Sequence, residues 1–259
     1  MRLIMVGCEY SGTSTLGYLI SRWAKENLGD EFGFHDHWQI PHVSHPGEPP
    51  AGKTREGMVD EFLDGKGIDP SLTGHTDEEN EAFLALSFKQ QEAFQRYHME
   101  YHVAETFYAD AHHNNIGFHI NEAVYAPRYY GYGGPGEYAD RDWMARRVEA
   151  DIMHKAPDSV LILVTASPEA IKQRLKSNPH PFGLVQEGDV EGVLAEFQHQ
   201  YDVSWLRHKF VIDTTNATPE ESLAEFAEKI EEHLIDTDRE KIMFQRQKKI
   251  AAATERLYA

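Results

Sequence analysis

The sequence predicts an α/β fold built on a doubly wound, parallel sheet of five strands. Five short apolar segments alternate with segments of helical periodicity, a pattern typical of parallel strands joined by helices. The segment 159–166 (SVLILVTA) is apolar nearly throughout, as expected of a buried strand. A glycine-containing turn, GCEYSG, separates the first apolar segment from the first helical one. Ligands of such sheets bind at the carboxyl ends of the strands, so function is sought there.

The amino-terminal strand, turn and helix are clearly marked. Residues 2–6 (RLIMV) form a short apolar run that predicts a buried strand. A helix is expected from Ser14 to about Leu28, after the glycine turn. Residues 32–38 (FGFHDHW) predict a second short strand. The helix is indicated by apolar residues at helical spacing, namely Leu16, Leu19, Ile20 and Trp23.

An insertion is expected over about 40–111. Residues 40–76 are rich in Pro, Gly and His with little periodicity, which is typical of a long loop. Residues 76–111 have a helical pattern that we expect to break once. The pattern opens with a capping box, in which Thr76 is the N-cap and Glu79 follows three residues later.

The second half of the chain supplies the remaining strands and helices. Residues 116–120 (IGFHI) predict the third strand, and the Gly/Tyr-rich residues 125–138 predict a loop. The fourth strand is 159–166, and residues 210–213 (FVID) predict the last one. Helices are expected over 140–155, 167–176, 189–201, 218–234 and 236–258.

Composition limits the class of protein. The 259 residues fit a single domain with insertions, and the formal net charge is −18. An acidic chain is unsuited to nucleic acid or an anionic membrane surface, since both attract basic proteins. The single cysteine, Cys8, and the lack of a long apolar run predict a cytoplasmic protein without a membrane-spanning helix. A homodimer is also considered, since the final helix could pair in trans.

The turn after the first strand carries the strongest chemical signal. Glycines permit a tight backbone path in which successive N–H groups and the following helix N-terminus face an anion. The loop therefore predicts a site for a phosphate or phosphosulfate group. The hydroxyl of Ser14 is in addition a candidate ligand of Mg²⁺. The residues expected to bind the ligand are Gly7, Ser11, Gly12, Thr13, Ser14 and Thr15.

This loop resembles those of two P-loop families. VGCEYSGTSTL is similar to the phosphosulfate loop of sulfotransferases, although Tyr10 stands where those enzymes usually carry Arg or Lys. The loop has Thr13 in place of the P-loop lysine that contacts the phosphates of a nucleotide. The rest of the chain resembles the nucleoside and thymidylate kinase group. That resemblance lies in SVLILVTASPEAIKQRLK (159–176), FVIDTTNATPEESLAEFAEKI (210–230) and FHINEAVYAPRYYG (118–131).

The kinase resemblance implies a single P-loop domain over 1–259, with a lid at about 177–187 and a carboxyl-terminal helix at about 236–258. It implies that Asp36, at the end of the second strand, accepts the proton of the acceptor hydroxyl. Arg174 corresponds to a lid arginine that neutralises charge on the transferred group.

Two further residues are candidates at the same edge. Glu122 could hold the acceptor or bind Mg²⁺ through water, and its alternative role is that of an acidic residue at a helix N-terminus. Arg128 or Arg174 could replace the positive charge that Thr13 lacks.

Three functions are compatible with these residues. The first is a phosphotransferase, similar to a small-molecule or nucleotide kinase, which uses ATP and Mg²⁺ on a small-molecule acceptor. The second is a sulfotransferase that uses a phosphoadenylyl sulfate donor without a metal. The third is a nucleotide-binding protein without catalysis.

Overall fold

The computed structural model describes residues 1–29, 33–36, 52–66, 76–108, 112–180 and 183–258. Its centre is a five-stranded sheet in the order β2-β3-β1-β4-β5, and every neighbouring pair is parallel. The predicted α/β fold with a parallel sheet is therefore confirmed. The strands are β1 (Arg2–Val6), β2 (Gly33–Asp36), β3 (His113–Ile116), β4 (Val160–Thr165) and β5 (His208–Asp213).

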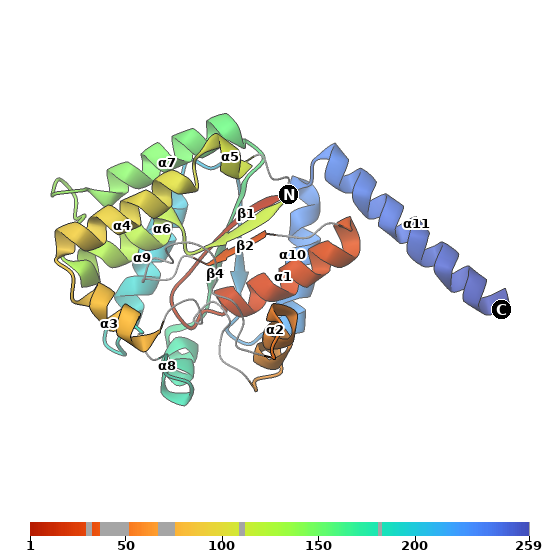
Figure 1. Cartoon of the computed structure of the whole chain (residues 1–259), viewed down its shortest axis with the longest axis horizontal. Helices are drawn as coiled ribbons and strands as arrows, with labels where there is room; N and C mark the ends of the chain where they lie inside the picture. The colour runs from red at the N-terminus through yellow and green to blue at the C-terminus, as the bar shows by residue number, and fades with distance from the viewer. Residues whose placement is uncertain (30–32, 37–51, 67–75, 109–111, 181–182, 259) are drawn as a thin grey trace.

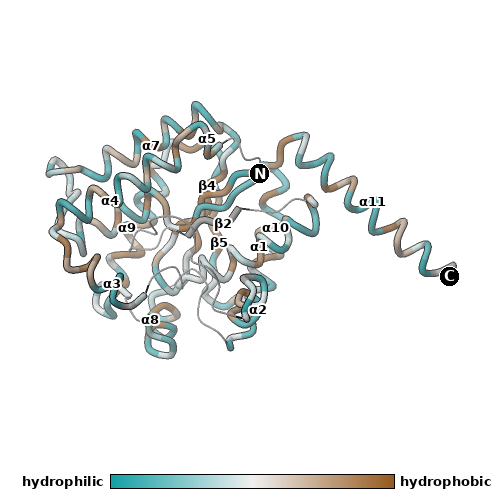
Figure 2. The backbone as a smooth tube through the Cα atoms, viewed as in Figure 1, coloured by the Kyte–Doolittle hydropathy of each residue, from teal (hydrophilic) through white to brown (hydrophobic). Residues whose placement is uncertain are grey.

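Helices cover both faces of the sheet (Figure 1). Alternate residues of β1 point to opposite faces, so Leu3 and Met5 join one core cluster while Ile4 and Val6 join the other. The Leu3 face packs against α1 (Thr13–Leu28) and α10 (Pro219–Ile230). The Ile4 face packs against α4 (Phe88–Tyr101), α6 (His119–Tyr125), α7 (Arg141–Lys155) and α9 (Val190–Val203). Figure 2 shows apolar residues gathered at the sheet and on the helix faces that meet it.

The third strand lies three residues earlier than the sequence predicts. The segment 116–120 is not a strand: β3 ends at Ile116, and α6 begins at His119. Gly117, with φ of 75°, turns the chain between them. The apolar pattern misses β3 because Asn114 and Asn115 are polar, although both are fully buried.

The insertion divides into short helices. The expected capping box is present, since Thr76 caps α3 (Asp77–Leu84) and Glu79 bonds back to the backbone of Thr76. The single break expected in 76–111 is wrong, because the chain breaks twice. Ser87 starts α4, and a turn after Tyr101 leads to α5 (Glu105–Tyr108). Of the predicted loop 40–76, residues 52–66 contain α2 (Arg55–Leu63), and the rest lies almost wholly outside the described residues.

Three further segments complete the chain. The predicted loop 125–138 begins instead with one π-helical segment, η2 (Ala126–Tyr130). After β4, α8 (Pro168–Ser177) starts at its N-cap Ser167, and a short 3₁₀ segment, η3 (Glu231–His233), follows α10. The carboxyl-terminal helix α11 (Asp236–Tyr258) is confirmed and projects from the body in Figure 1. Within the described residues, every helix is too short or too polar to cross a bilayer.

Candidate phosphate-binding site

The glycine loop connects β1 to α1 at the carboxyl edge of the sheet. Gly7 lies so close to β4 that a Cβ atom at this position would be 2.2 Å from the carbonyl oxygen of Val164. Gly12 has φ of 92°, a left-handed conformation that favours glycine, and it is the N-cap of α1. Both glycines are therefore required by the backbone path of the loop.

The N-terminus of α1 has no side-chain cap. Gly12 offers no capping side chain, and the first turn of the helix has no acidic residue. The first helical backbone bond runs from the N–H of Leu16 to Gly12 O, at 2.9 Å, so the N–H groups of residues 13–15 precede it. The hydroxyl of Ser11 is fully buried and has no hydrogen-bond partner among the described residues. Backbone N–H groups at a helix N-terminus, beside a buried hydroxyl with no described partner, are suited to bind a phosphate oxygen.

Arg174 and Thr214 form hydrogen bonds to the backbone of the glycine loop. Thr214 Oγ1 donates a hydrogen bond to Ser11 O at 2.7 Å. Arg174, in the last turn of α8, donates from Nη1 to Tyr10 O at 3.0 Å and from Nη2 to Thr214 O at 2.6 Å. Burial lowers the pKa of Arg174 below its usual range, but arginine remains charged at neutral pH. The structure thus brings a positive charge to the loop that lacks a lysine.

The side chains of Glu9 and Tyr10 attach the loop to the segment after α8. The Glu9 carboxylate accepts hydrogen bonds from the backbone N–H groups of Leu184 and Val185 at 3.0 and 3.1 Å. The Tyr10 hydroxyl accepts one from the N–H of His180 at 2.9 Å, and the two rings stack 4.4 Å apart. We call residues 183–185 with His180 the strap.

Glu9 is electrostatically unusual. Desolvation raises the pKa of its carboxyl group, while the two N–H donors of the strap act in the opposite direction. On its other side, the backbone N–H of Glu9 donates to the hydroxyl of Tyr125 at 3.0 Å, which joins the loop to α6. The strap, the loop and α6 are therefore joined through one residue.

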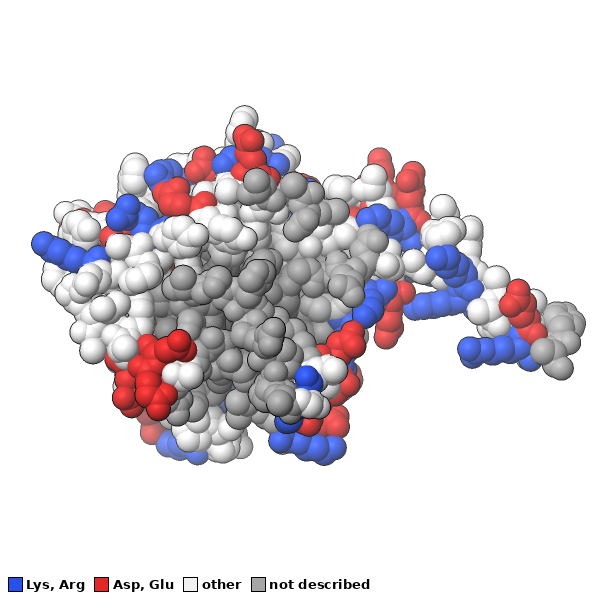
Figure 3. Space-filling view, viewed as in Figure 1, with Lys and Arg blue, Asp and Glu red and all other residues white. Residues whose placement is uncertain are grey.

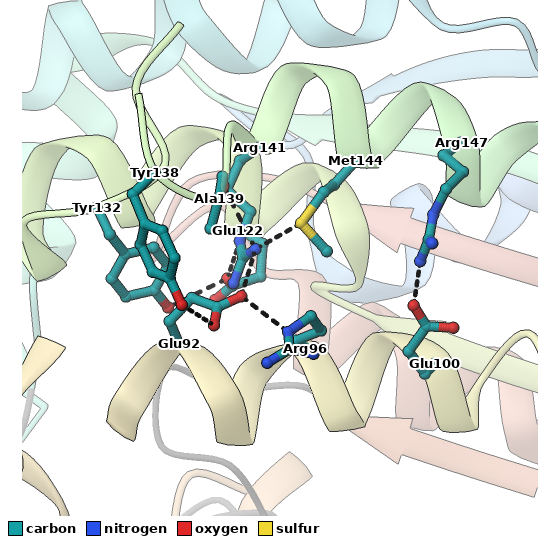
Figure 4. A network of polar contacts seen from close by, with 10 residues as sticks. All are labelled: Glu92, Arg96, Glu100, Glu122, Tyr132, Tyr138, Ala139, Arg141, Met144 and Arg147. Atoms are coloured by element: carbon teal, nitrogen blue, oxygen red, sulfur yellow. Dashed lines mark hydrogen bonds and ion pairs between the residues drawn. The ribbon is translucent and has the colours of Figure 1, made fainter. Parts of the chain in front are cut away.

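Glu122 lies in a buried network of charges between α4, α6 and α7 (Figure 4). Arg141, which is 1% exposed, donates from Nε to Glu122 at 2.9 Å and from Nη1 to Glu92 at 3.3 Å. The hydroxyl of Tyr132 donates to Glu122 at 3.4 Å. Desolvation raises the pKa of Glu122, and the positive charge of Arg141 opposes this shift. Arg141 Nη2 has no partner among the described residues, so the network keeps one donor unused.

Arg128 and Asp36 are the other two predicted catalytic residues. Arg128, in η2, faces the start of α9, where its Nη1 is 3.9 Å from the carboxylate of Asp189. Asp36 is the last residue of β2, and its backbone is paired with Ile116 of β3 at the carboxyl edge. Its side chain lies outside the described part of the structure.

Side chains able to bind a metal ion are not clustered in the described part of the chain. No group of three or more His, Cys, Asp or Glu side chains there is arranged to hold a metal ion. Cys8 is buried, and desolvation raises the pKa of its thiol, so it is a poor nucleophile or ligand. Ser14 lies in the first turn of α1, and its role in binding Mg²⁺ stays a prediction.

Sequence reasoning missed the partners that give this site its shape. Glu9, Thr214 and Tyr125 come from segments more than 80 residues apart, and no local pattern connects them. Glu92 occurs among the polar residues of an amphipathic helix, yet it is 1% exposed. The sequence offers one signal for Arg141, namely that it lies with Arg146 and Arg147 in the helix predicted over 140–155.

The comparisons with known proteins give structural neighbours only. No family model and no curated protein sequence matches the chain. Among solved structures, the YorR protein of Bacillus subtilis, in complex with phosphorylated GDP, is 15% identical with a TM-score of 0.49, over 90% of this chain and 99% of that one. Deoxyadenosine kinase of M. mycoides, with bound dATP, is 12% identical with a TM-score of 0.46, over 89% and 100%.

Thymidylate kinase of Candida albicans is 14% identical, with a TM-score of 0.47, over 90% of this chain and 93% of that one. The neighbours include nucleoside and thymidylate kinases, as the sequence resemblance predicts. These TM-scores are below 0.5, so the likeness carries no conclusion about function.

Proposed function

We propose that the protein is a P-loop phosphotransferase that uses ATP and Mg²⁺ on a small-molecule or nucleotide acceptor. The observation that carries this proposal is the buried hydroxyl of Ser11, which has no partner among the described residues and lies next to the uncapped N-terminus of α1. Backbone N–H groups and a helix N-terminus bind phosphate without any lysine, although a lysine would add charge.

The residues of the chain fit the requirements of phosphoryl transfer. Such transfer depends mostly on positioning and on neutralising the charge of the transferred group. The N–H groups of residues 13–15 would hold phosphate oxygens, and Arg174 would supply positive charge at the outer side of the loop. The Ser14 hydroxyl would hold Mg²⁺, which when bound would neutralise negative charge on the phosphates.

The acceptor side of the proposed site is formed by Asp36 and Glu122. Asp36 would accept the proton of the acceptor hydroxyl, for which its place at the carboxyl end of β2 is suitable. Arg141 fixes the carboxylate of Glu122, so that Glu122 would orient the acceptor. The free Nη2 donor of Arg141 supports a polar acceptor.

Sulfuryl transfer is the alternative, favoured by the Ser-Gly-Thr-Ser sequence at residues 11–14. Tyr10, at the position where sulfotransferases usually carry a cation, has its hydroxyl bonded to the strap. A nucleotide-binding protein without turnover is the third alternative. It would share the anion site but would release no product.

Thermal unfolding with a panel of ligands tests the proposal. The panel is ATP, GTP and ADP, each with and without Mg²⁺, and adenosine 3′,5′-bisphosphate without metal. A ligand of the folded state at about 100 times its Kd should raise the Tm by about 5–10 °C. We expect the largest shift with ATP and Mg²⁺, and stabilisation by the bisphosphate alone would instead support sulfuryl transfer.

Two matched serine variants test whether the rise in Tm depends on the glycine loop. Ser11→Ala should fold normally, because its hydroxyl has no partner in the described structure, but it should reduce the shift with ATP and Mg²⁺. Ser159→Ala removes another buried, unpartnered hydroxyl just before β4, at the opposite edge of the sheet, and should leave the shift unchanged. Equal shifts in both variants would exclude Ser11 as a ligand. No shift with any ligand would exclude a nucleotide site.

A further inference from the structure

The carboxyl-terminal helix α11 leaves the body after its first turns. Ile242, 8% exposed, packs in the core cluster on the Leu3 face of the sheet. Beyond this anchor the helix continues away from the body (Figure 1), and all residues from Arg246 to Arg256 are exposed. The exposed part carries large apolar side chains, namely Met243, Phe244 and Ile250, which are 56%, 54% and 67% exposed.

A helix without a packing partner is marginal in water. Most of the stability of a protein helix comes from burying an apolar face, and short isolated helices fray. The exposed half of α11 lacks such burial, yet it presents apolar side chains that would gain from being covered. A contact with another molecule would bury these apolar side chains and thereby stabilise the helix.

The charge of α11 differs in sign from that of the rest of the chain. It has six Lys and Arg residues against four Asp and Glu residues, so it carries +2 while the remaining residues carry −20. Four of the six cations lie from Arg246 onward, where Glu255 is the one acidic residue. The arm, defined as residues 243–256, is therefore both apolar and basic.

A surface of matching character lies at the other end of the molecule. Helix α3 has four acidic residues and neither Lys nor Arg, and the charges of α4 balance. Figure 3 shows the acidic side chains of α3 far from the blue side chains of the arm. Exposed apolar side chains adjoin them, and we call this surface the α3–α4 patch. It comprises Glu78, Glu79, Glu81, Leu84, Phe88, Phe94 and Tyr97.

We propose that the arm of one molecule packs on the α3–α4 patch of a second copy of this chain. Figure 1 places α11 and α3 at opposite ends of the molecule, so the arm does not reach the patch of its own chain. Apolar side chains meet apolar side chains in this contact, and Lys248 and Lys249 face the acidic residues of α3. If two molecules exchange arms, the contact closes as a dimer, and if not, it extends as a chain.

The mass of the full chain in solution tests this contact. Light scattering after size exclusion, over protein concentrations of about 1–100 µM in low salt, should show a dimer or a larger assembly that dissociates as salt is raised. The pair Lys248→Glu with Lys249→Glu should raise the dissociation constant at least about tenfold. Combining it with Glu78→Lys and Glu81→Lys should restore association. The charges of the arm and of the α3–α4 patch are then exchanged, so the two surfaces still attract each other.

The control is a pair with the same change of charge elsewhere. Lys53→Glu with Lys66→Glu changes two exposed residues flanking α2 and should not affect association. A monomer at every concentration would overturn the proposal, as would an assembly that the arm variants leave intact. A monomer that instead binds anionic vesicles through the arm would also overturn it, by showing a different partner.

Discussion

At the scale of single residues, Gly7 gives the sharpest constraint. A side chain there would collide with the backbone of β4, which cannot move without disturbing its bonds to β1 and β5. Tyr10 shows a different constraint, because it has φ of 68° without being glycine. Its left-handed backbone is maintained by contacts on both sides, with Arg174 at its carbonyl and His180 at its hydroxyl.

Gly7→Ala should lower the free energy of unfolding by about 1–3 kcal/mol, since the added methyl group overpacks the contact with Val164. Gly188→Ala is the matched control, because a Cβ atom there meets nothing within 4 Å. It should leave stability unchanged or raise it by up to about 1 kcal/mol. Urea unfolding of both variants measures the difference, and equal stabilities would refute the close approach of the loop to β4.

At the scale of secondary-structure elements, Arg141 joins three helices. It lies in the first turn of α7 and contacts Glu122 of α6 and Glu92 of α4, and its guanidinium carbon lies 4.9 Å from the ring centre of Tyr132. A buried charge of this kind is stabilising only while its partners remain, because each unpaired member would keep its full desolvation cost.

Arg141→Met should therefore lower the free energy of unfolding by about 3–5 kcal/mol, because it leaves the Glu122 carboxylate buried without a cation and leaves Glu92 with Arg96 as its remaining ion-pair partner. Arg147→Met makes the same change on the same helix, but its ion pair with Glu100 lies at the surface. That variant should cost at most about 1 kcal/mol. Chemical unfolding at neutral pH compares the two, and a similar loss in both would mean that the network contributes little.

At the scale of the whole molecule, Glu9 makes the free energy of unfolding depend on pH. Its pKa in the folded protein is raised above its ordinary value of 4.5, mainly because its carboxyl group is desolvated. The folded state then binds the proton more tightly than the unfolded chain does. The resulting stabilisation is complete below pH 4.5 and is lost as the pH rises through the raised pKa.

Glu9→Gln removes this titration. We expect the variant to gain stability relative to the wild type as the pH rises from about 4.5 to 8, as measured by urea unfolding at several pH values. Glu122 also has a raised pKa, but it is present in both proteins, so its effect cancels in the difference. Glu187→Gln, an exposed carboxylate close to the strap, should change stability by at most about 1 kcal/mol at each pH. A flat difference between Glu9→Gln and the wild type would contradict the prediction.

The sequence predicts the parts of this molecule that local patterns encode. The β1–loop–α1 unit, the buried strand β4, the cap at Thr76 and the last helix all follow from periodicity and turn chemistry. The position of β3 does not, because its buried Asn114 and Asn115 look like surface residues. Nor do the partners of Arg141 or Glu9, because long-range pairing of buried polar groups leaves no local signal.

The bonds from Thr214 and Arg174 to the glycine loop have a consequence for synthesis of the chain. Ser11 and Thr214 are 203 positions apart, and Tyr10 and Arg174 are 164 apart. A nascent chain emerging from the ribosome therefore exposes the whole glycine loop long before the residues that hold it are made. Closing such long loops costs entropy that is recovered only once β4 and β5 have joined the sheet. Competence to bind the proposed nucleotide should accordingly appear late, after translation has passed Thr214, so that unfinished chains would not sequester it.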